Sequence, residues 1–256
     1  MAAGRGSKGG RRPTSRKPSA KSSSGSASKR APKPAPTQKS PASRRPAPAA
    51  PPPERPAPPS GPFRLGAVPG TTPGKWIDIW QERMPETPLA LVPLPVAGQR
   101  NALDDGEVDA ALVRLPIASD GLHVIRLYDE VPVVVCAADS HLTAAEELTL
   151  ADLAGEVVIV PQDDVLRLTV PDAVAPRFAA PATTEDAIAT VAAGVGIVIV
   201  PMSLARLHHR KDADFRPLTS GPTSTVALAW PTGEPSPLVD TFVGIVRGRT
   251  ANSSRG

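Results

Sequence analysis

The chain has 256 residues, a formal net charge of +4, 33 prolines and one cysteine. One cysteine excludes an internal disulfide framework and is typical of a reducing compartment. No stretch approaches the roughly 18 consecutive apolar residues of a membrane span, and no apolar core follows the basic start as in a signal peptide. We therefore expect a cytoplasmic protein that does not insert into membranes.

Charge divides the chain into two parts. Residues 1–60 hold 14 Lys or Arg and one acid, a formal charge of +13, whereas the remaining 196 residues hold 15 Lys or Arg and 24 acids, a formal charge of −9. The first part also contains 14 prolines and almost no large apolar side chains. Such a segment cannot bury enough surface to offset its ordering entropy. We predict a disordered basic tail at 1–61 and a short disordered end at 251–256.

The basic tail is predicted to contact phosphates. It lacks stacking aromatic residues, so its cations would bind nucleic acid through the backbone without reading bases. The alternative is a solubilising leader or spacer with no partner. The candidate cations for non-specific contact with DNA are Arg11, Arg12, Arg16, Lys17, Lys21, Lys29, Arg30, Lys33, Arg44 and Arg45.

The body of the chain alternates predicted strands and helices. In chain order, strands are expected at Phe63–Val68, Leu89–Leu94, Asp109–Arg114, Leu122–Leu127, Val131–Ala137, Val157–Val160, Ile197–Val200, Phe215–Leu218 and Thr225–Trp230. Helices are expected from Thr72, at Gln99–Asp105, Leu150–Leu153, Thr184–Val195 and Ser203–His208, and from Ser236. A turn is expected at Tyr128–Glu130. This alternation predicts an α/β fold with largely parallel sheets.

The segment TTEDAIATVAAGVGIVIVPMS, beginning at Thr183, is the most informative stretch. A threonine can cap a helix whose first turn carries two acids, and apolar residues then recur with helical spacing. Gly194 and Gly196 are suited to the turn that ends the helix, because glycine adopts left-handed conformations easily. The apolar run Ile197–Val200 is typical of a strand covered on both faces.

This segment resembles the end of the effector-binding domain of LysR-type transcriptional regulators. Three other stretches resemble the same family in the same order: GEVDAALVR from Gly106, LYDEVPVVVCAADSHL from Leu127 and LTLADLAGEVVIVP from Leu148. The resemblance implies an effector-binding domain over 62–250, built as two Rossmann-like lobes with a cleft between them, like a type 2 periplasmic binding protein. Lobe I would hold 62–136 and 226–250, and lobe II 137–225.

The chain departs from that family in two places. The family normally carries a winged helix-turn-helix before this domain, and the residues before Phe63 show none. Between Pro161 and Thr183 the family usually has a helix and a strand, whereas this chain has a short stretch containing Pro171, Pro176 and Pro181. That wall of the cleft is therefore expected to be abbreviated.

The ends of predicted strands supply the candidate effector site. Ligands in open α/β sheets bind beyond the carboxyl ends of strands, where helix N-termini offer unpaired N–H groups. Two such junctions, one in each lobe, could grip a small anion from both sides, and an arginine could pair with a carboxylate. Alternatively, the threonines only cap helices and Arg114 bridges to Asp109 or Glu107. The candidates are Gly70, Thr71, Thr72, Gln99, Arg114, Gln162, Thr183 and Thr184.

Signals for catalysis or cofactors are absent from the sequence. The four histidines, at 123, 141, 208 and 209, lack metal-ligand spacing with Cys136 or paired acids. Cys136 ends an apolar run, where a small buried filler is expected, and no nucleophile, nucleotide or dinucleotide motif occurs. We expect no enzyme, no cofactor and no metal.

The sequence therefore predicts a LysR-like sensor of a small anionic effector, involved in transcription regulation. Family members dimerise through surface helices, so the resemblance implies a homodimer or a heterodimer with a full-length regulator, with the helices at Trp76–Met84 and Asp186–Val195 as candidates. Two alternatives stay open. One is a nucleoid-type nucleic-acid-binding protein whose body serves oligomerisation, and the other is a solute-binding protein.

Overall fold

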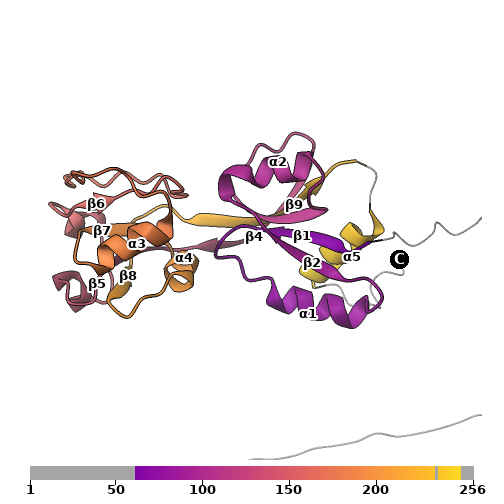
Figure 1. Ribbon diagram of the computed structural model, residues 1–256, viewed down its shortest axis with the longest axis horizontal. Coiled ribbons are helices and arrows are strands. Elements are labelled where there is room, and N and C mark those ends of the chain that lie inside the picture. The colour runs from indigo at the N-terminus through magenta and orange to yellow at the C-terminus, as the bar shows by residue number, and fades with distance from the viewer. Residues whose placement is uncertain (1–60, 234–235, 249–256) are drawn as a thin grey trace, which may run out of the picture. The chain divides into compact units, whose positions relative to one another are not determined.

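The computed structural model of the chain describes residues 61–233 and 236–248. The predicted tail up to residue 60 and the predicted C-terminal end lie outside the described residues. Within the described ranges, no helix is long and apolar enough to cross a membrane. Two mixed sheets with flanking helices form an α/β fold, as predicted (Figure 1).

The first sheet has the strand order β2-β1-β3-β9-β4 and is the centre of lobe I. Its strands β2, β1 and β3 run parallel, whereas β9 is antiparallel to both β3 and β4. The strands are β1 (Phe63–Ala67), β2 (Leu89–Pro93), β3 (Ala110–Arg114), β4 (Leu122–Glu130) and β9 (Ser224–Pro231). The helices of this lobe are α1 (Gly74–Arg83), the 3-10 turn η1 (Val96–Gly98), α2 (Gln99–Asp104) and α5 (Pro237–Val246).

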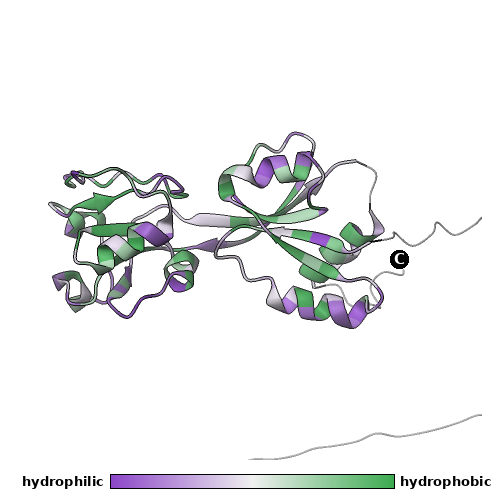
Figure 2. Ribbon diagram, viewed as in Figure 1, coloured by the Kyte–Doolittle hydropathy of each residue, from purple (hydrophilic) through white to green (hydrophobic). Residues whose placement is uncertain are grey.

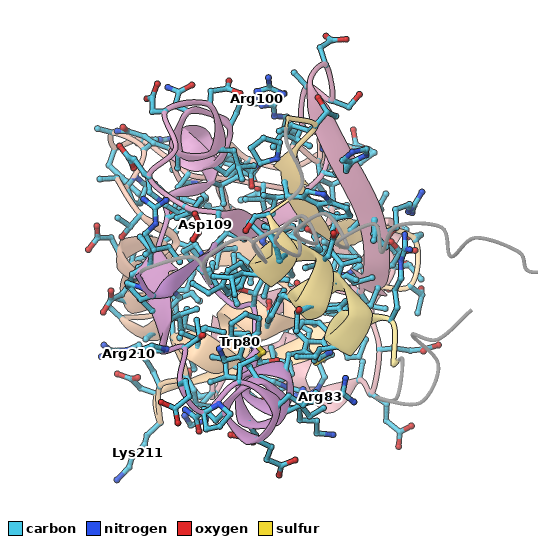
Figure 3. The ribbon with its side chains drawn as sticks, turned by 90° about the vertical axis from the view of Figure 1, so that its right-hand side faces the viewer. Trp80, Arg83, Arg100, Asp109, Arg210 and Lys211 are labelled. Carbon is cyan, nitrogen blue, oxygen red and sulfur yellow. The ribbon has the colours of Figure 1, made fainter. Side chains whose placement is uncertain are left out.

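Both faces of this sheet are covered, because its central strand β3 is buried along its whole length. Ala110 and Leu112 pack into a cluster with α1 and α5, and Ala111 and Val113 pack into a cluster with α2. Figure 1 shows α2 on one side of the sheet and α1 with α5 on the other. Trp80, labelled in Figure 3, points from α1 into the first cluster, where it is fully buried.

The second sheet has the strand order β6-β7-β5-β8 and is the centre of lobe II. β6 pairs in parallel with β7, whereas β5 is antiparallel to both of its neighbours, β7 and β8. The strands are β5 (Pro132–Ala137), β6 (Val158–Ile159), β7 (Ile197–Pro201) and β8 (Ala213–Pro217). The helices are the 3-10 turns η2 (His141–Ala144) and η3 (Leu150–Leu153), followed by α3 (Thr184–Ala192) and α4 (Met202–Leu207).

The two faces of the second sheet are covered differently. Helices α3 and α4 cover one face, and strand residues such as Val198 and Val200 pack against them. The other face packs against the 3-10 turns and an irregular stretch that contributes Leu166 and Val170. This stretch contains neither a helix nor a named strand, so lobe II is abbreviated there as the sequence predicts. Figure 2 shows strands such as β1 and β7 as mainly hydrophobic, whereas β4 and β9 are paler or hydrophilic where they pass between the lobes.

The predicted parallel arrangement holds for all strands but one in each sheet. In the first sheet β9 runs opposite to the other four strands, because the chain passes from lobe I to lobe II along β4 and returns along β9. In the second sheet β5 runs opposite to the other three strands. One prediction about the strands is wrong. The turn predicted at Tyr128–Glu130 is the end of β4, which stays paired with β9 as far as Glu130 across a register shift after Arg126. Tyr128 and Asp129 are exposed on this two-stranded ribbon, whereas Glu130 pairs with the buried Arg114. Three consecutive polar residues therefore resemble a turn in the sequence.

Candidate functional site

A cavity of about 660 Å³ lies between the lobes. We call it the cleft cavity. Lobe I contributes apolar side chains such as Val96 and Ile117, and lobe II contributes Leu204 from α4 and the start of α3. Ionisable side chains of both signs line it. These are Arg100, Arg114, Asp163, Asp164, Arg167, Glu185 and His208.

The structure divides the eight predicted effector residues between two cavities. Gln99, Arg114, Gln162, Thr183 and Thr184 line the cleft cavity. The other three, Gly70, Thr71 and Thr72, line a second cavity of about 570 Å³ on the side of the crossing strands, together with Tyr128, Glu130 and Met202. We call it the hinge cavity. The two helix-start junctions therefore line different cavities, and the role of all eight residues in effector binding stays a prediction.

Gln99 is committed to the backbone of β3. Its side-chain nitrogen donates to the carbonyl of Arg114 (2.8 Å), and its side-chain oxygen accepts from the Arg114 N–H (2.9 Å). Gln99 is 5% exposed, so these bonds satisfy groups that water cannot reach. The glutamine thus fixes the end of β3, from which the Arg114 side chain departs.

Arg114 is buried, with 2% of the residue exposed, and its guanidinium contacts four different segments. Its Nη1 donates to Glu130 Oε2 (2.7 Å) and to the hydroxyl of Ser224 (2.8 Å). Its Nη2 donates to the carbonyl of Pro69 (3.1 Å) and to the hydroxyl of Ser203 in lobe II (3.0 Å). The predicted alternative partners, Asp109 and Glu107, are not its ion-pair partners. Asp109 instead pairs with Arg64 at 2.7 Å.

The two threonines at the start of α3 are engaged within the protein. Thr183 is the N-cap, since its hydroxyl accepts from the Asp186 N–H (3.1 Å) and also donates to the Asp186 carboxylate (2.8 Å). Thr184 is 3% exposed and donates to Asp163 Oδ1 (2.9 Å). Gln162 donates weakly, at 3.3 Å, to the carbonyl of Ala180. The carboxylates of Asp163 and Asp186 therefore already accept from the threonine hydroxyls that were predicted to bind an anionic ligand.

The junction in lobe I is less occupied. Helix α1 has Pro73 as its N-cap, no side-chain cap and no acid in its first turn. The Thr71 hydroxyl donates to the carbonyl of Val68 (2.7 Å). Gly70 has a φ of +84°, and a β-carbon added there would clash with the Ser203 hydroxyl. Glycine is therefore required at this point, where the lobe I backbone meets α4.

Among the cavity-lining residues that sequence reasoning missed, four matter most for the site. Arg167 and His208 line the cleft cavity, and Glu130 and Ser203 line the hinge cavity. Among the described residues, the Arg167 guanidinium has no hydrogen bond or ion pair, and its backbone has a φ of +50°. The signal that could have found Arg167 is its place in the abbreviated stretch after Pro161. Ser203 gives no signal, because a serine in a short helix is ordinary.

In the described part of the chain, no group of three or more His, Cys, Asp or Glu residues is placed to hold a metal ion. Cys136 is fully buried in β5, and this burial raises the pKa of its thiol, so it is an unreactive filler. In the hinge cavity, burial first and the charge of Glu130 second raise the pKa of Tyr128 above its usual range.

Residues 56–251 match the family model described as LysR substrate binding domain. The Hca operon transcriptional activator HcaR of Escherichia coli K12 is 28% identical over 189 residues, which cover 70% of this chain and 63% of HcaR. The HTH-type transcriptional regulator CatR of Pseudomonas putida is 32% identical over 171 residues, which cover 63% of this chain and 58% of CatR. The chain thus spans about three fifths of the length of these curated relatives.

Solved structures agree with the sequence matches on the fold. The BenM effector binding domain with its effector benzoate superposes with a TM-score of 0.61 at 20% identity, covering 77% of this chain and 95% of that domain. At this identity the likeness supports the two-lobe fold alone.

Proposed function

Because the chain belongs to the LysR substrate binding domain family, we propose that it senses a small molecule in the cleft cavity and thereby regulates transcription. The observation that carries this proposal is the cavity itself. It lies between the lobes, has a volume of about 660 Å³ and is lined from both sides by apolar and ionisable side chains. A volume in the range of about 300–1,000 Å³ is typical of small-molecule sites.

We propose further that the effector is a small organic acid. Arg167 is the cation of the cleft cavity whose guanidinium lacks a partner among the described residues. Arg100, in contrast, donates to Asp104, Ala118 and Asp120, and Arg114 faces Glu130. The acids Asp163 and Asp164 already accept hydrogen bonds from lobe II. BenM, whose domain has the same fold, binds benzoate as its effector. A carboxylate would pair with Arg167 while its apolar body packs on Val96 and Ile117.

Thermal shift with a panel of small aromatic and aliphatic carboxylates, starting with benzoate, tests this proposal. A ligand that binds only the native state at about 100 times its dissociation constant stabilises it by about 2.7 kcal/mol. The matching amides and amines serve as neutral and cationic controls. We expect at least one carboxylate to raise the melting temperature while its amide and amine do not. Stabilisation by the amines alone would contradict an anionic effector.

Arg167→Ala then locates the site. We expect this change to abolish the carboxylate-dependent shift, because it removes the partner of the ligand. Arg177→Ala is the matched control, since Arg177 is exposed, belongs to the same irregular stretch and does not line the cleft cavity. Thr71→Ala and Thr184→Ala test the two predicted junctions. Unchanged affinity in both would remove the helix starts from the site.

For the basic tail we propose non-specific contact with DNA. The ten candidate cations lie outside the described residues, so the proposal rests on composition and charge. If about 6–10 cations engage phosphates, affinity falls roughly 10³–10⁵-fold between 50 and 200 mM salt. Fluorescence anisotropy with a generic duplex should show salt-sensitive binding by the whole chain and none by a shortened chain of residues 62–256. Absence of binding by both would leave the tail as a spacer, and binding without any effector response would favour the nucleoid-type alternative.

We also propose that the protein works as a dimer in the cytoplasm, with itself or with a full-length regulator. Helices α1 and α3 are the proposed contacts, by analogy with the family. Light scattering after size-exclusion chromatography measures the mass directly. A monomer at all concentrations would refute the homodimer and leave the heterodimer to be tested by co-purification with a full-length regulator.

A further inference from the structure

A buried arginine takes part in the side-chain hydrogen bonds that join the two lobes. Arg114 belongs to β3 of lobe I, and its Nη2 donates to the hydroxyl of Ser203 in α4 of lobe II (3.0 Å). The Ser203 hydroxyl in turn donates to Glu130 Oε2 (2.8 Å), the same oxygen that accepts from Arg114 Nη1 (2.7 Å). The three groups therefore form a closed triangle. It connects the core of lobe I, the end of a crossing strand and a helix of lobe II.

Ser203 is well placed to report the position of lobe II. Its neighbours Leu204 and Ala205 are buried in the cluster that also holds β5 and β7. Any displacement of lobe II must therefore move Ser203 with it. On the other side, Gly70 leaves no room for even a methyl group before the Ser203 hydroxyl. The Gly70 backbone and the Ser203 side chain therefore fit closely against each other.

The contact also separates the two cavities. Pro69 lines the cleft cavity and its neighbour Gly70 lines the hinge cavity. In the same way, Leu204 lines the cleft cavity and its neighbour Ser203 lines the hinge cavity. The boundary between the cavities therefore runs through the Arg114–Ser203 contact, and breaking that contact would join them.

The closed arrangement leaves one polar group unsatisfied. Arg114 Nε is buried and has no hydrogen-bond partner. Among the described residues, it is the one buried side-chain nitrogen or oxygen without a partner. An unpaired buried donor opposes the state that contains it. The Arg114 guanidinium therefore makes four hydrogen bonds, one of them to lobe II, and lacks a fifth at Nε. Such a balance is suited to a contact that opens and closes.

We propose that Arg114 and Ser203 form a latch between the lobes, closed in this structure, whose opening lets lobe II move and joins the cleft cavity to the hinge cavity. The function of Arg114 is thus to position lobe II rather than to bind the effector. This inference goes beyond effector sensing and does not depend on it, because the latch can be tested without any ligand.

Distances between spin labels on the two lobes test the latch. Cys136 is the one cysteine in the chain, so a Cys136→Ala background permits labelling at Glu107→Cys in lobe I and Lys211→Cys in lobe II, both exposed. The full chain is diluted with unlabelled protein to suppress distances between subunits. We expect one narrow distance distribution for the background protein. Ser203→Ala, Arg114→Lys and Gly70→Ala should each add a second, longer-distance population, because each removes or blocks the same contact.

Arg126→Ala is the matched control. Arg126 also lies on the crossing strand β4, but its partners Asp129 and Thr225 belong to the same sheet, so its loss should leave the distribution unchanged. Circular dichroism checks that each variant is folded. An unchanged distribution in Ser203→Ala and Gly70→Ala, with both proteins folded, would overturn the latch. A broadened distance distribution in Arg126→Ala would also overturn the latch, because the lobes would then move apart after any substitution on the crossing strands.

Discussion

Substitution of Arg114 leaves the Glu130 carboxylate without its cation, and the resulting loss in the free energy of unfolding can be estimated from the structure. In Arg114→Met, Glu130 keeps the Ser203 hydroxyl as a donor but loses its cation while its side chain is only 10% exposed. Breaking a buried ion pair by removing one partner costs about 3–5 kcal/mol, because the remaining charge is uncompensated. With an m-value of about 2 kcal/mol per M urea, the unfolding midpoint should fall by roughly 1.5–2.5 M.

The double variant Arg114→Met with Glu130→Gln separates charge from packing. The double variant should have a free energy of unfolding at least about 1.5 kcal/mol higher than Arg114→Met alone, because no buried carboxylate is then left without its cation. Urea unfolding followed by tryptophan fluorescence reports lobe I, where Trp76, Trp80 and Trp230 all lie, and circular dichroism reports both lobes. A cost below about 1 kcal/mol for the single variant, or no recovery in the double variant, would refute the reasoning. Arg126→Met, at an exposed pair, should cost only about 0–1 kcal/mol.

Three further predictions concern single side chains. Phe242→Ala should cost about 3–5 kcal/mol in urea unfolding, because Phe242 is fully buried with its ring centroid 5.1 Å from that of Phe63; a cost near zero would mean that α5 does not pack as described. The thiol of Cys136 should react with a disulfide reagent at pH 8 only as fast as the protein unfolds, since burial raises its pKa; rapid reaction of the native protein would contradict this. Tyr128, the one tyrosine, should ionise above pH 10 in an ultraviolet titration, and Glu130→Gln should lower that midpoint, because Glu130 is the second cause of the raised pKa after burial.

Local patterns predicted most of the individual elements. Helix α3 and strand β7 lie where the segment from Thr183 placed them, and Thr183 is the cap, because caps, apolar spacing and glycine turns act within a few residues. The direction of β9, which runs opposite to the other strands of its sheet, could not be predicted in the same way. It depends on the chain crossing between lobes twice, and that crossing leaves no periodic signal in β4 or β9.

The site shows the same division between local and distant information. The sequence brought out residues at strand ends, and five of them line the cleft cavity together with Arg167. It could not assign the partner of Arg114, because Glu130, Ser203 and Ser224 come from three separate segments up to 110 positions away. Neighbouring acids such as Asp109 were therefore considered as partners. The actual network exists only once both lobes are in place.

The order of strands has a consequence for synthesis on the ribosome. Strand β9 lies between β3 and β4 in the first sheet, although it is made about a hundred residues after them, and Phe242 of α5 completes the cluster beneath that sheet. The strands of the second sheet, in contrast, all lie between positions 132 and 217. Chains usually fold from the N-terminus as they emerge. Here the later lobe can close first, and the earlier lobe must wait with exposed apolar strands until almost the whole chain has been made.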